Sequence, residues 1–374
     1  MISRGDLERL LQREDGEHRV LSLFLDMSVN SDNKRTFQVF LNQKRSQFEE
    51  LQSDRPGQHV EAIGETLARV DRWLAEEYNE ENRGVVLYAE VGGDWFEALQ
   101  FPVPVPNRFV ISDRPVIAPL AQVLESYHHH GVVLLDREHV RILSVYLGRL
   151  LEELAFDADP LPTRHDVQAG GYSQSRYQRR KLEEMRHFFR DFVEELEAFV
   201  ERYQPDDLVI LGTDENVAKF QEFMPDRLRR MVAYTGPMRV DQSASDVVAQ
   251  IEPHLQAERE RESMELLDQV RSRAEQDYLA AAGFQSTLTA LQEGKVDTLV
   301  IARDQERQGS RCSKCGFLFA REVEACPYDG GEVTPGIDIV EEAVRLAETQ
   351  GASVEFVATS AVNDLRGVGA LLRF

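Results

Sequence analysis

The stretch Gln168-Ala-Gly-Gly-Tyr-Ser-Gln-Ser-Arg-Tyr-Gln-Arg-Arg180 places a glycine pair directly before a basic, amphipathic segment. Gly170 and Gly171 can adopt backbone angles that a side chain would forbid, so they predict a flexible or tightly turned tip. Ser173 is suited to cap the helix that follows. The middle of the chain is therefore predicted to be built around a glycine loop and the helix that begins at its end.

The segment after Ser173 has two chemically different faces. Apolar residues recur at spacings of three and four, which predicts one buried stripe: Leu182, Met185, Phe189, Phe192, Val193, Leu196, Phe199, Val200 and Tyr203. At about 100° per residue, five arginines fall on the opposite side: Arg176, Arg179, Arg180, Arg186 and Arg190. Because arginine binds phosphate through a planar fork and stacks on bases, this row predicts contact with the end of an RNA molecule. A solvated helix face beside a surface turn is the alternative.

The overall charge restricts where RNA can bind. The chain has 374 residues with 42% hydrophobic content, enough for two or three domains with well-formed cores. Its 43 Lys and Arg against 66 Asp and Glu give a net charge of −23, so the chain as a whole is repelled by nucleic acid and anionic membranes. Residues 164–190 reverse that sign, with seven Lys or Arg against three Asp or Glu. Any RNA contact must therefore be local.

The sequence contains no recognisable targeting or membrane segment. Residues 1–10 lack the apolar core of a signal peptide, and no run approaches the roughly 18 to 20 apolar residues of a membrane span. We therefore expect a cytoplasmic protein that acts as a monomer and does not contact membranes.

Helical and strand patterns alternate along the whole chain. Helices are predicted at 3–12, 37–51, 63–74, 173–203, 216–223, 225–230, 245–278, 284–292 and 337–350. Strands are predicted at 19–26, 85–90, 95–99, 131–136, 140–146, 207–212, around 232, and at 298–302, 353–357 and 366–374. This order predicts an α/β (α+β) fold with three domains in series: 1–130, 131–258 with the glycine loop and basic helix, and 259–374.

Three adjacent histidines, His128 to His130, precede the strand predicted at 131–136. Histidine is a common metal ligand, but neighbouring side chains on one strand rarely converge on one ion. We therefore interpret this run as the end of a loop.

All three cysteines lie between positions 312 and 326, which favours a clustered metal site over a disulfide framework. Cys312-Ser-Lys-Cys315 has metal-knuckle spacing, and Cys326-Pro-Tyr-Asp329 stands where a second knuckle is expected. Structural zinc prefers four ligands, and an aspartate oxygen can complete a set of three thiolates. We expect zinc to be held by Cys312, Cys315, Cys326 and Asp329 in a ribbon-like insert at 309–334. A degenerate ribbon that has lost its metal is the alternative.

Taken together, these features resemble the class-1 peptide chain release factors of eukaryotes and archaea and their ribosome-rescue relative Pelota, over nearly the whole chain. The similar features follow one another in order: the connector Phe101 to Pro106, Ser112-Asp113, Gly131 to Asp136, Gly170-Gly171 before the basic helix, Leu288 to Val300, the cysteine insert, Gly351 to Phe356 and Gly367 to Phe374. Each feature is weak alone, and their order carries the resemblance.

The resemblance implies a tRNA-shaped arrangement of three domains. The first domain would enter the decoding centre of the small ribosomal subunit, and the second would carry its glycine tip to the acceptor end of peptidyl-tRNA. The third, of the RNA-binding ribosomal-protein type, would contact the large subunit and a translational GTPase of the elongation-factor Tu type. The implied partners are therefore rRNA and peptidyl-tRNA on the ribosome.

Two departures from the family change the expected function. Release factors carry Gly-Gly-Gln at the tip, where this chain has Tyr172, a larger residue whose hydroxyl is a poor base at neutral pH. The stop-codon signatures Asn-Ile-Lys-Ser and Tyr-x-Cys-x-x-x-Phe are also missing. Lys34 and Arg35 remain as a basic turn that we predict contacts RNA. Stop-codon reading is therefore not expected.

Three functions compete. The leading hypothesis is a bacterial or archaeal-type paralogue that occupies the ribosomal A site for rescue or hibernation. The second is an enzyme that cuts peptidyl-tRNA, at the ester or within the acceptor strand, so the residues leave open whether the chain is catalytic. Its working residues would be Gly170, Gly171, Tyr172, Ser173, Gln174 and Arg176, with Gln174 standing in for the displaced glutamine. The third is a module that binds another RNA or a protein.

Overall fold

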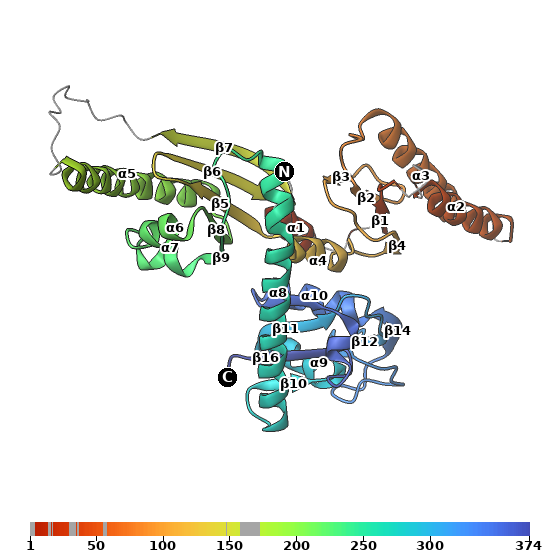
Figure 1. Ribbon diagram of the computed structural model, residues 1–374. Coiled ribbons are helices and arrows are strands. Elements are labelled where there is room, and N and C mark those ends of the chain that lie inside the picture. Colours follow the sequence, from red (N-terminus) through yellow and green to blue (C-terminus); the bar gives the residue numbers. More distant parts are fainter. Residues whose placement is uncertain are drawn as a thin grey trace. The chain divides into compact units, whose positions relative to one another are not determined.

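The structure, a computed structural model, describes residues 4–13, 16, 18–29, 35, 37–54, 58–146, 148–157 and 173–374. Helices and strands are mixed along the chain, so the predicted α/β class is confirmed. The chain packs as two compact units (Figure 1). Unit 1 combines Met1–Ser126 with Arg261–Phe374, and unit 2 is Tyr127–Glu260. The division into three domains at 130/131 and 258/259 stays a prediction.

The N-terminal part of unit 1 is a four-stranded antiparallel sheet with the order β3-β2-β1-β4. Its strands are β1 (Val20–Asp26), β2 (Gly84–Glu90), β3 (Phe96–Phe101) and β4 (Arg108–Ser112), and its helices are α1 (Arg4–Leu11), α2 (Phe37–Asp54), α3 (Gln58–Glu76) and α4 (Ala118–Ser126). Alternate residues of a strand point to one face. Leu21, Leu23 and Leu25 therefore share a buried cluster with Val70 and Trp73 of α3.

The C-terminal part of unit 1 has its own sheet, with the order β10-β16-β11-β15. Its elements are β10 (Ala280–Ala282), α9 (Phe284–Gln292), β11 (Val296–Ala302), α10 (Ile339–Thr349), β15 (Ser353–Val357), η1 (Thr359–Val362) and β16 (Val368–Leu372). The strands β11 and β15 are parallel, which requires a crossover, and α10 lies in that crossover. A small sheet is inserted before α10, with the order β13-β12-β14: β12 (Gln308–Cys312), β13 (Leu318–Phe319) and β14 (Val333–Asp338).

The first turn of α10 binds the segment that leads into α4, through contacts that we call the α4–α10 seam. The buried Glu341 carboxylate accepts backbone N–H bonds from Ile117 (2.9 Å) and Ala118 (2.8 Å). Arg345 donates to Glu341 (3.1 Å) and to the Pro115 carbonyl. Two further ion pairs join the same segments: Arg108–Asp338 (2.7 Å) and Arg114–Glu342 (3.0 Å). The seam therefore caps the free N–H groups of α4 with a carboxylate from the distant end of the chain.

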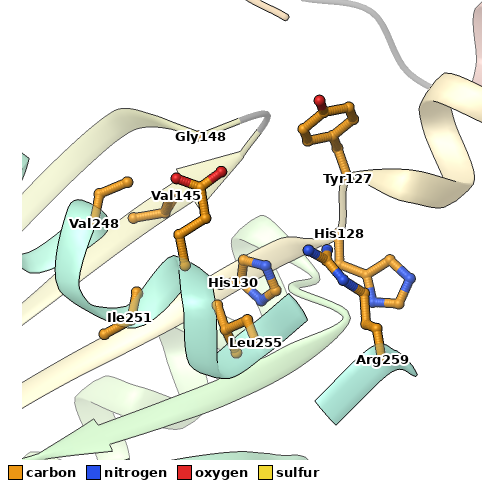
Figure 2. A pocket seen from close by; sticks show the side chains of 10 residues that line it. Tyr127, His128, His130, Val145, Gly148, Val248, Ile251, Leu255 and Arg259 are labelled. Carbon is orange, nitrogen blue, oxygen red and sulfur yellow. The ribbon is translucent and has the colours of Figure 1, made fainter. Parts of the chain in front are cut away.

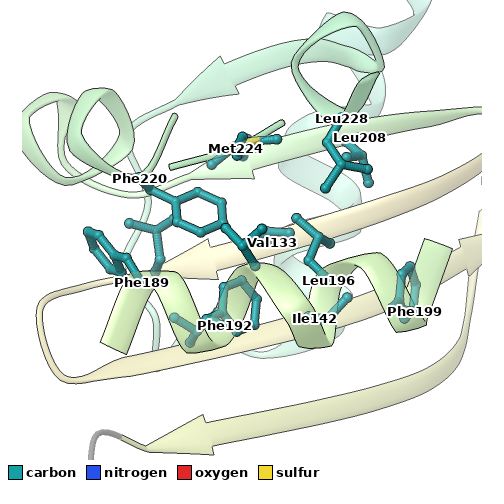
Figure 3. Close-up of a cluster of buried hydrophobic side chains, with 14 of the residues drawn as sticks. Val133, Ile142, Phe189, Phe192, Leu196, Phe199, Leu208, Phe220, Met224 and Leu228 are labelled. Atoms are coloured by element: carbon teal, nitrogen blue, oxygen red, sulfur yellow. The ribbon is translucent and has the colours of Figure 1, made fainter. Parts of the chain in front are cut away.

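Unit 2 is one sheet between two helices. The sheet has the order β7-β6-β5-β8-β9, antiparallel among β5 to β7 and parallel from β5 to β9. Its elements are β5 (His129–Leu135), β6 (His139–Tyr146), β7 (Arg149–Asp157), α5 (Ser173–Tyr203), β8 (Asp207–Leu211), α6 (Asp214–Gln221), α7 (Asp226–Arg230), β9 (Val232–Gly236) and α8 (Ala244–Glu275), which continues past the end of the unit. Apolar residues of α5 cover one face of the sheet (Figure 3), and Val247, Ile251 and Leu255 of α8 cover the other.

A glycine allows α5 to lie close to this sheet. A Cβ atom on Gly131 would lie 2.7 Å from Leu208 Cδ2 and 3.0 Å from Phe199 Cε1. Such distances are shorter than carbon atoms tolerate, so a side chain here would force Leu208 and Phe199 to shift. Both side chains are buried, so the absence of a side chain at Gly131 lets them pack in their present positions.

Several elements were missing from the sequence-based prediction: β4, β7, β10 and α4. The strand β7 carries Leu and Glu in an irregular order and lies at a sheet edge, so neither face gives a clear period. The strand β5 begins at His129, two residues before the predicted start. The proline-rich connector after Phe101 lies outside any strand, as predicted, because proline lacks the N–H that pairing needs.

Candidate functional site

The helix predicted after the glycine loop is α5, which runs from Ser173 to Tyr203. Gly170, Gly171 and Tyr172 lie outside the described residues. Gln174, Arg176, Arg179 and Arg180 lie on α5, in a part of the helix whose side chains the structure does not describe. The described part of the predicted apolar stripe is buried at Met185, Phe189, Phe192, Val193, Leu196, Phe199 and Val200. The stripe therefore fixes how the helix is rotated against the sheet.

Arg186 and Arg190 are both exposed, while Met185 and Phe189 beside them are buried. The two guanidinium groups are therefore accessible to a ligand in solution. Both residues stand on a helix that is fixed by a well-packed core, so the fold sets the backbone positions from which the two side chains extend.

The charge on α5 is distributed against the helix dipole. Residues 173–190 carry six Lys or Arg and two Asp or Glu, whereas residues 191–203 carry one Arg and five Asp or Glu. A helix has partial positive charge at its N-terminus and partial negative charge at its C-terminus, and the effect is confined to the first and last turns. In α5 it therefore disfavours Arg176 and Glu201, by about 0.3–1 kcal/mol each at low ionic strength. An anion bound at the first turn would relieve the repulsion of Arg176.

Arg35, the described member of the predicted basic turn, is engaged within the chain. Its guanidinium lies 5.2 Å from the ring centroid of Tyr78 and 3.9 Å from the Glu80 carboxylate. Lys34 lies outside the described residues. An RNA contact by Arg35 would therefore compete with these two neighbours.

The three cysteines and Asp329 converge in the insert. The four donor atoms all lie within 4.8 Å of one another. Cys315 Sγ is 3.7 Å from Cys326 Sγ, and Cys312 Sγ is 3.5 Å from the nearer Asp329 oxygen. Two thiolates bound to zinc at about 2.3 Å in a tetrahedron are separated by nearly this distance. The donor set therefore fits a four-coordinate metal ion with no open position.

The two halves of this cluster have the same backbone geometry. Gly316 N donates to the Cys312 carbonyl (3.0 Å), and Gly330 N donates to the Cys326 carbonyl (2.9 Å). Gly316 and Gly330 have φ values of 74° and 67°, which favour glycine. Each four-residue knuckle thus closes on a glycine in the left-handed region. Gly316 and Gly330 were not chosen from the sequence, although a glycine directly after each ligand pair was a usable signal.

Backbone N–H groups favour the charged forms of two ligands. The N–H groups of Cys315 and Lys314, each 3.4 Å from Cys312 Sγ, lower the pKa of the Cys312 thiol. A hydrogen bond from Gly331 N (2.9 Å) lowers the pKa of Asp329 to about 2. Thiolate and carboxylate are the forms that bind a metal ion. Cys312 and Asp329 are therefore favoured in their anionic forms. The Phe317 N–H also acts to lower the pKa of the Cys315 thiol, but desolvation and hydrogen bonds with Cys312, Cys326 and Asp329 raise that pKa to about 11.

Among the described residues, no helix is both long and apolar enough to cross a bilayer.

Comparison with known proteins gives two family matches. Residues 115–256 match bacterial archaeo-eukaryotic release factor family 10, and residues 260–374 match domain 3 of the eukaryotic release factor eRF1. Peptide chain release factor subunit 1 of Archaeoglobus fulgidus is 27% identical over 313 residues, 74% of each chain. The resemblance to the class-1 release factor and Pelota superfamily is therefore confirmed.

Solved structures of the same group are similar to the chain. An archaeal translation termination factor is 19% identical and covers 100% of this chain and 99% of its own, with a TM-score of 0.27. A ribosome-bound archaeal Pelota is 13% identical and covers 78% of this chain and 77% of its own, with a TM-score of 0.40.

Proposed function

We propose that the chain is a ribosome-binding translation factor that occupies the A site, for rescue or hibernation, without reading a stop codon. The observation that carries this proposal is the order of the two family matches, with 115–256 directly before 260–374 as in a release factor. Neither match includes residues 1–114, the segment in which the stop-codon signatures are missing. The ribosome-bound state of one archaeal Pelota is in line with the proposed partner.

The N-terminal half of α5 would hold the acceptor end of a tRNA or a neighbouring rRNA segment. Six basic residues lie in residues 173–190, and the described Arg186 and Arg190 are exposed. Because arginine binds phosphate through a planar fork, phosphate binding is the interaction that these residues support best.

Sedimentation with ribosomes tests the proposal. The wild-type chain should appear in the ribosomal fraction, and cryo-electron microscopy of that fraction should show it in the A site. Arg186→Glu combined with Arg190→Glu should leave the chain in the free fraction. Arg202→Glu is the matched control, because Arg202 is exposed on the acidic end of the same helix. A wild-type chain that remains free under growth, stress and starvation would refute ribosome binding and favour another RNA or protein partner.

Peptidyl-tRNA hydrolysis through the glycine loop is the second candidate function, favoured by Gly170-Gly171, which is separated from the start of α5 by Tyr172 alone. Tyr172 or Gln174 would orient a water molecule at the ester. Ribosome-bound peptidyl-tRNA incubated with the wild type should then release peptide, and Tyr172→Ala or Gln174→Ala should abolish release. Wild-type release no faster than the uncatalysed background removes this candidate and leaves the A-site proposal intact.

The cysteine insert would hold structural zinc through Cys312, Cys315, Cys326 and Asp329. The zinc would cross-link the two knuckles, because all four positions of a tetrahedron are filled by the chain. The ion would therefore stabilise the C-terminal part of unit 1 and would not take part in a reaction. A partner GTPase of the elongation-factor Tu type remains part of the proposal and is tested by co-purification with the ribosome complex.

A further inference from the structure

Two consecutive aspartates hold three consecutive histidines where unit 2 begins. Asp206 accepts a hydrogen bond from the His129 backbone N–H (2.7 Å) and donates its own backbone N–H to the His129 carbonyl (2.8 Å). The carboxylate of Asp207 lies between two rings, 2.6 Å from His130 Nδ1 and 3.9 Å from His128 Nδ1. The acidic pair thus holds both the backbone and the side chains of the histidine run.

The three histidine rings have different surroundings. The His129 ring lies 2.8 Å from the buried Ser144 hydroxyl, and its burial lowers the pKa of His129. The His128 and His130 rings share Asp207. Alternate positions of an extended chain point to one face, which explains the difference. Only His128 combines a nearby carboxylate with a side chain that is still 35% exposed, so His128 is the ring that can exchange a proton readily.

His128 and His130 line a small pocket with residues of α8 (Figure 2). Val145, Ile251 and Leu255 form its apolar part, and Arg259 and Glu252 are its charged members. The pocket includes Tyr127, the first residue of unit 2, and Arg259, the second residue from its end. The pocket is therefore lined by residues from both ends of unit 2.

We propose that His128 and Asp207 form a pH-dependent ion pair. The pair fixes the first connection to unit 2 when His128 is protonated, and this connection becomes looser when His128 is neutral. The distance of 3.9 Å is too long for a hydrogen bond but suits an ion pair. A neutral His128 has no charge with which to hold the carboxylate. The connection is then retained by the backbone bonds of His129 and by His130.

The charges around His128 set the direction of the effect. The nearby Asp207 carboxylate raises the pKa of His128, while burial and Arg259 oppose that rise, and Asp206 adds to it. Burial acts to raise the pKa of Asp207, but the two histidines together lower it, so Asp207 stays ionised near neutrality. A histidine whose pKa is raised on folding adds stability below its ordinary pKa and loses it as pH rises through the raised value. The His128–Asp207 ion pair therefore forms in mild acid and is lost in mild alkali.

Hydrogen exchange of the full chain tests this inference. Protection factors, corrected for intrinsic exchange rates, should be several-fold higher at pH 6 than at pH 8 in peptides covering residues 120–131. Peptides covering β15 in unit 1 should show no such change. His128→Gln should remove the pH dependence, whereas His187→Gln, which changes an exposed histidine on α5, should keep it.

Equal protection at both pH values in the wild type would overturn the inference, as would a pH dependence that survives in His128→Gln. Asp207→Asn should also remove the effect, and since His130 loses its partner as well, protection should fall at both pH values. If that variant does not fold, His128→Gln still decides the question. None of these outcomes depends on ribosome binding, so the inference stands or falls separately from the proposed function.

Discussion

The basic half of α5 and the cysteine insert differ in where their charges are neutralised. In the insert, three thiols and a carboxylate face one another within 4.8 Å, and backbone N–H groups support them. On α5, cations gather at the helix end that already carries positive partial charge, and Arg186 and Arg190 are exposed. The insert resembles a binding site for one metal ion, whereas the basic half of α5 resembles a surface that binds another molecule. Substitutions in the first should change stability, and substitutions in the second should change binding.

Loss of the metal ligands should have the largest effect. Structural zinc contributes an apparent binding free energy of about 10–16 kcal/mol in zinc-finger peptides. We expect Cys326→Ser to abolish bound zinc, measured by mass spectrometry of the metal content, and to remove hydrogen-exchange protection across residues 308–338. Asp329→Cys is the control, because four thiolates should bind zinc at least as well. If the wild type, purified with zinc, carried no metal, the insert would be the degenerate ribbon.

The α4–α10 seam should show the next largest effect, since its charges are also neutralised within the chain. Glu341→Ala removes the cap of α4 and leaves Arg345 buried without its carboxylate, which should cost about 3–5 kcal/mol in unfolding free energy. Glu341→Gln keeps the shape and one acceptor oxygen, so its cost should be smaller. Urea unfolding measures the unfolding free energy of both variants. An equal loss of unfolding free energy in the two variants would show that packing, and not charge, stabilises the seam.

Reversing charge on α5 should change binding more than stability. Arg186→Glu with Arg190→Glu changes two exposed residues that lie beyond the first turn of the helix, so the unfolding free energy should change by less than about 1 kcal/mol. Ribosome affinity should fall, and the slope of its dependence on salt should decrease by about one for each phosphate that the variant no longer binds. A large drop in stability with unchanged affinity would reverse the contrast between α5 and the insert.

Single charge changes at the acidic end of α5 should have the smallest effect. Glu197→Gln removes an exposed anion that repels Glu201, which lies four residues further along the same helix. We expect a gain of a few tenths of a kcal/mol in thermal unfolding and no change in ribosome binding. Reduced ribosome binding by this variant would mean that the acidic half of the helix also contacts the partner.

Much of the secondary structure of unit 2 could be predicted from local sequence patterns. The spacing of Met185, Phe189, Phe192 and Leu196 predicted both the existence of α5 and its buried face. The strand β7 was missed because an edge strand lacks a regular alternation. The helix α4 was missed because Ala118, Pro119, Leu120, Ala121 and Val123 are all buried, so its sequence has no clear polar face from which to read a period. The glycine tip is predictable only as a motif, and the chemistry of Tyr172 stays a prediction.

The sequence by itself determined the features that depend on neighbours along the chain: the amphipathic α5, the charge reversal along it, and the spacing of the two knuckles Cys312 to Cys315 and Cys326 to Asp329. Each follows from spacings of a few residues, which helix geometry and knuckle geometry convert directly into proximity. Only the tertiary structure decided which distant residues meet. Asp207 reaches His130 because β8 pairs with β5, and Glu341 reaches Ala118 across more than two hundred residues. Such pairings depend on strand order and on the packing of whole elements, and no local period encodes them.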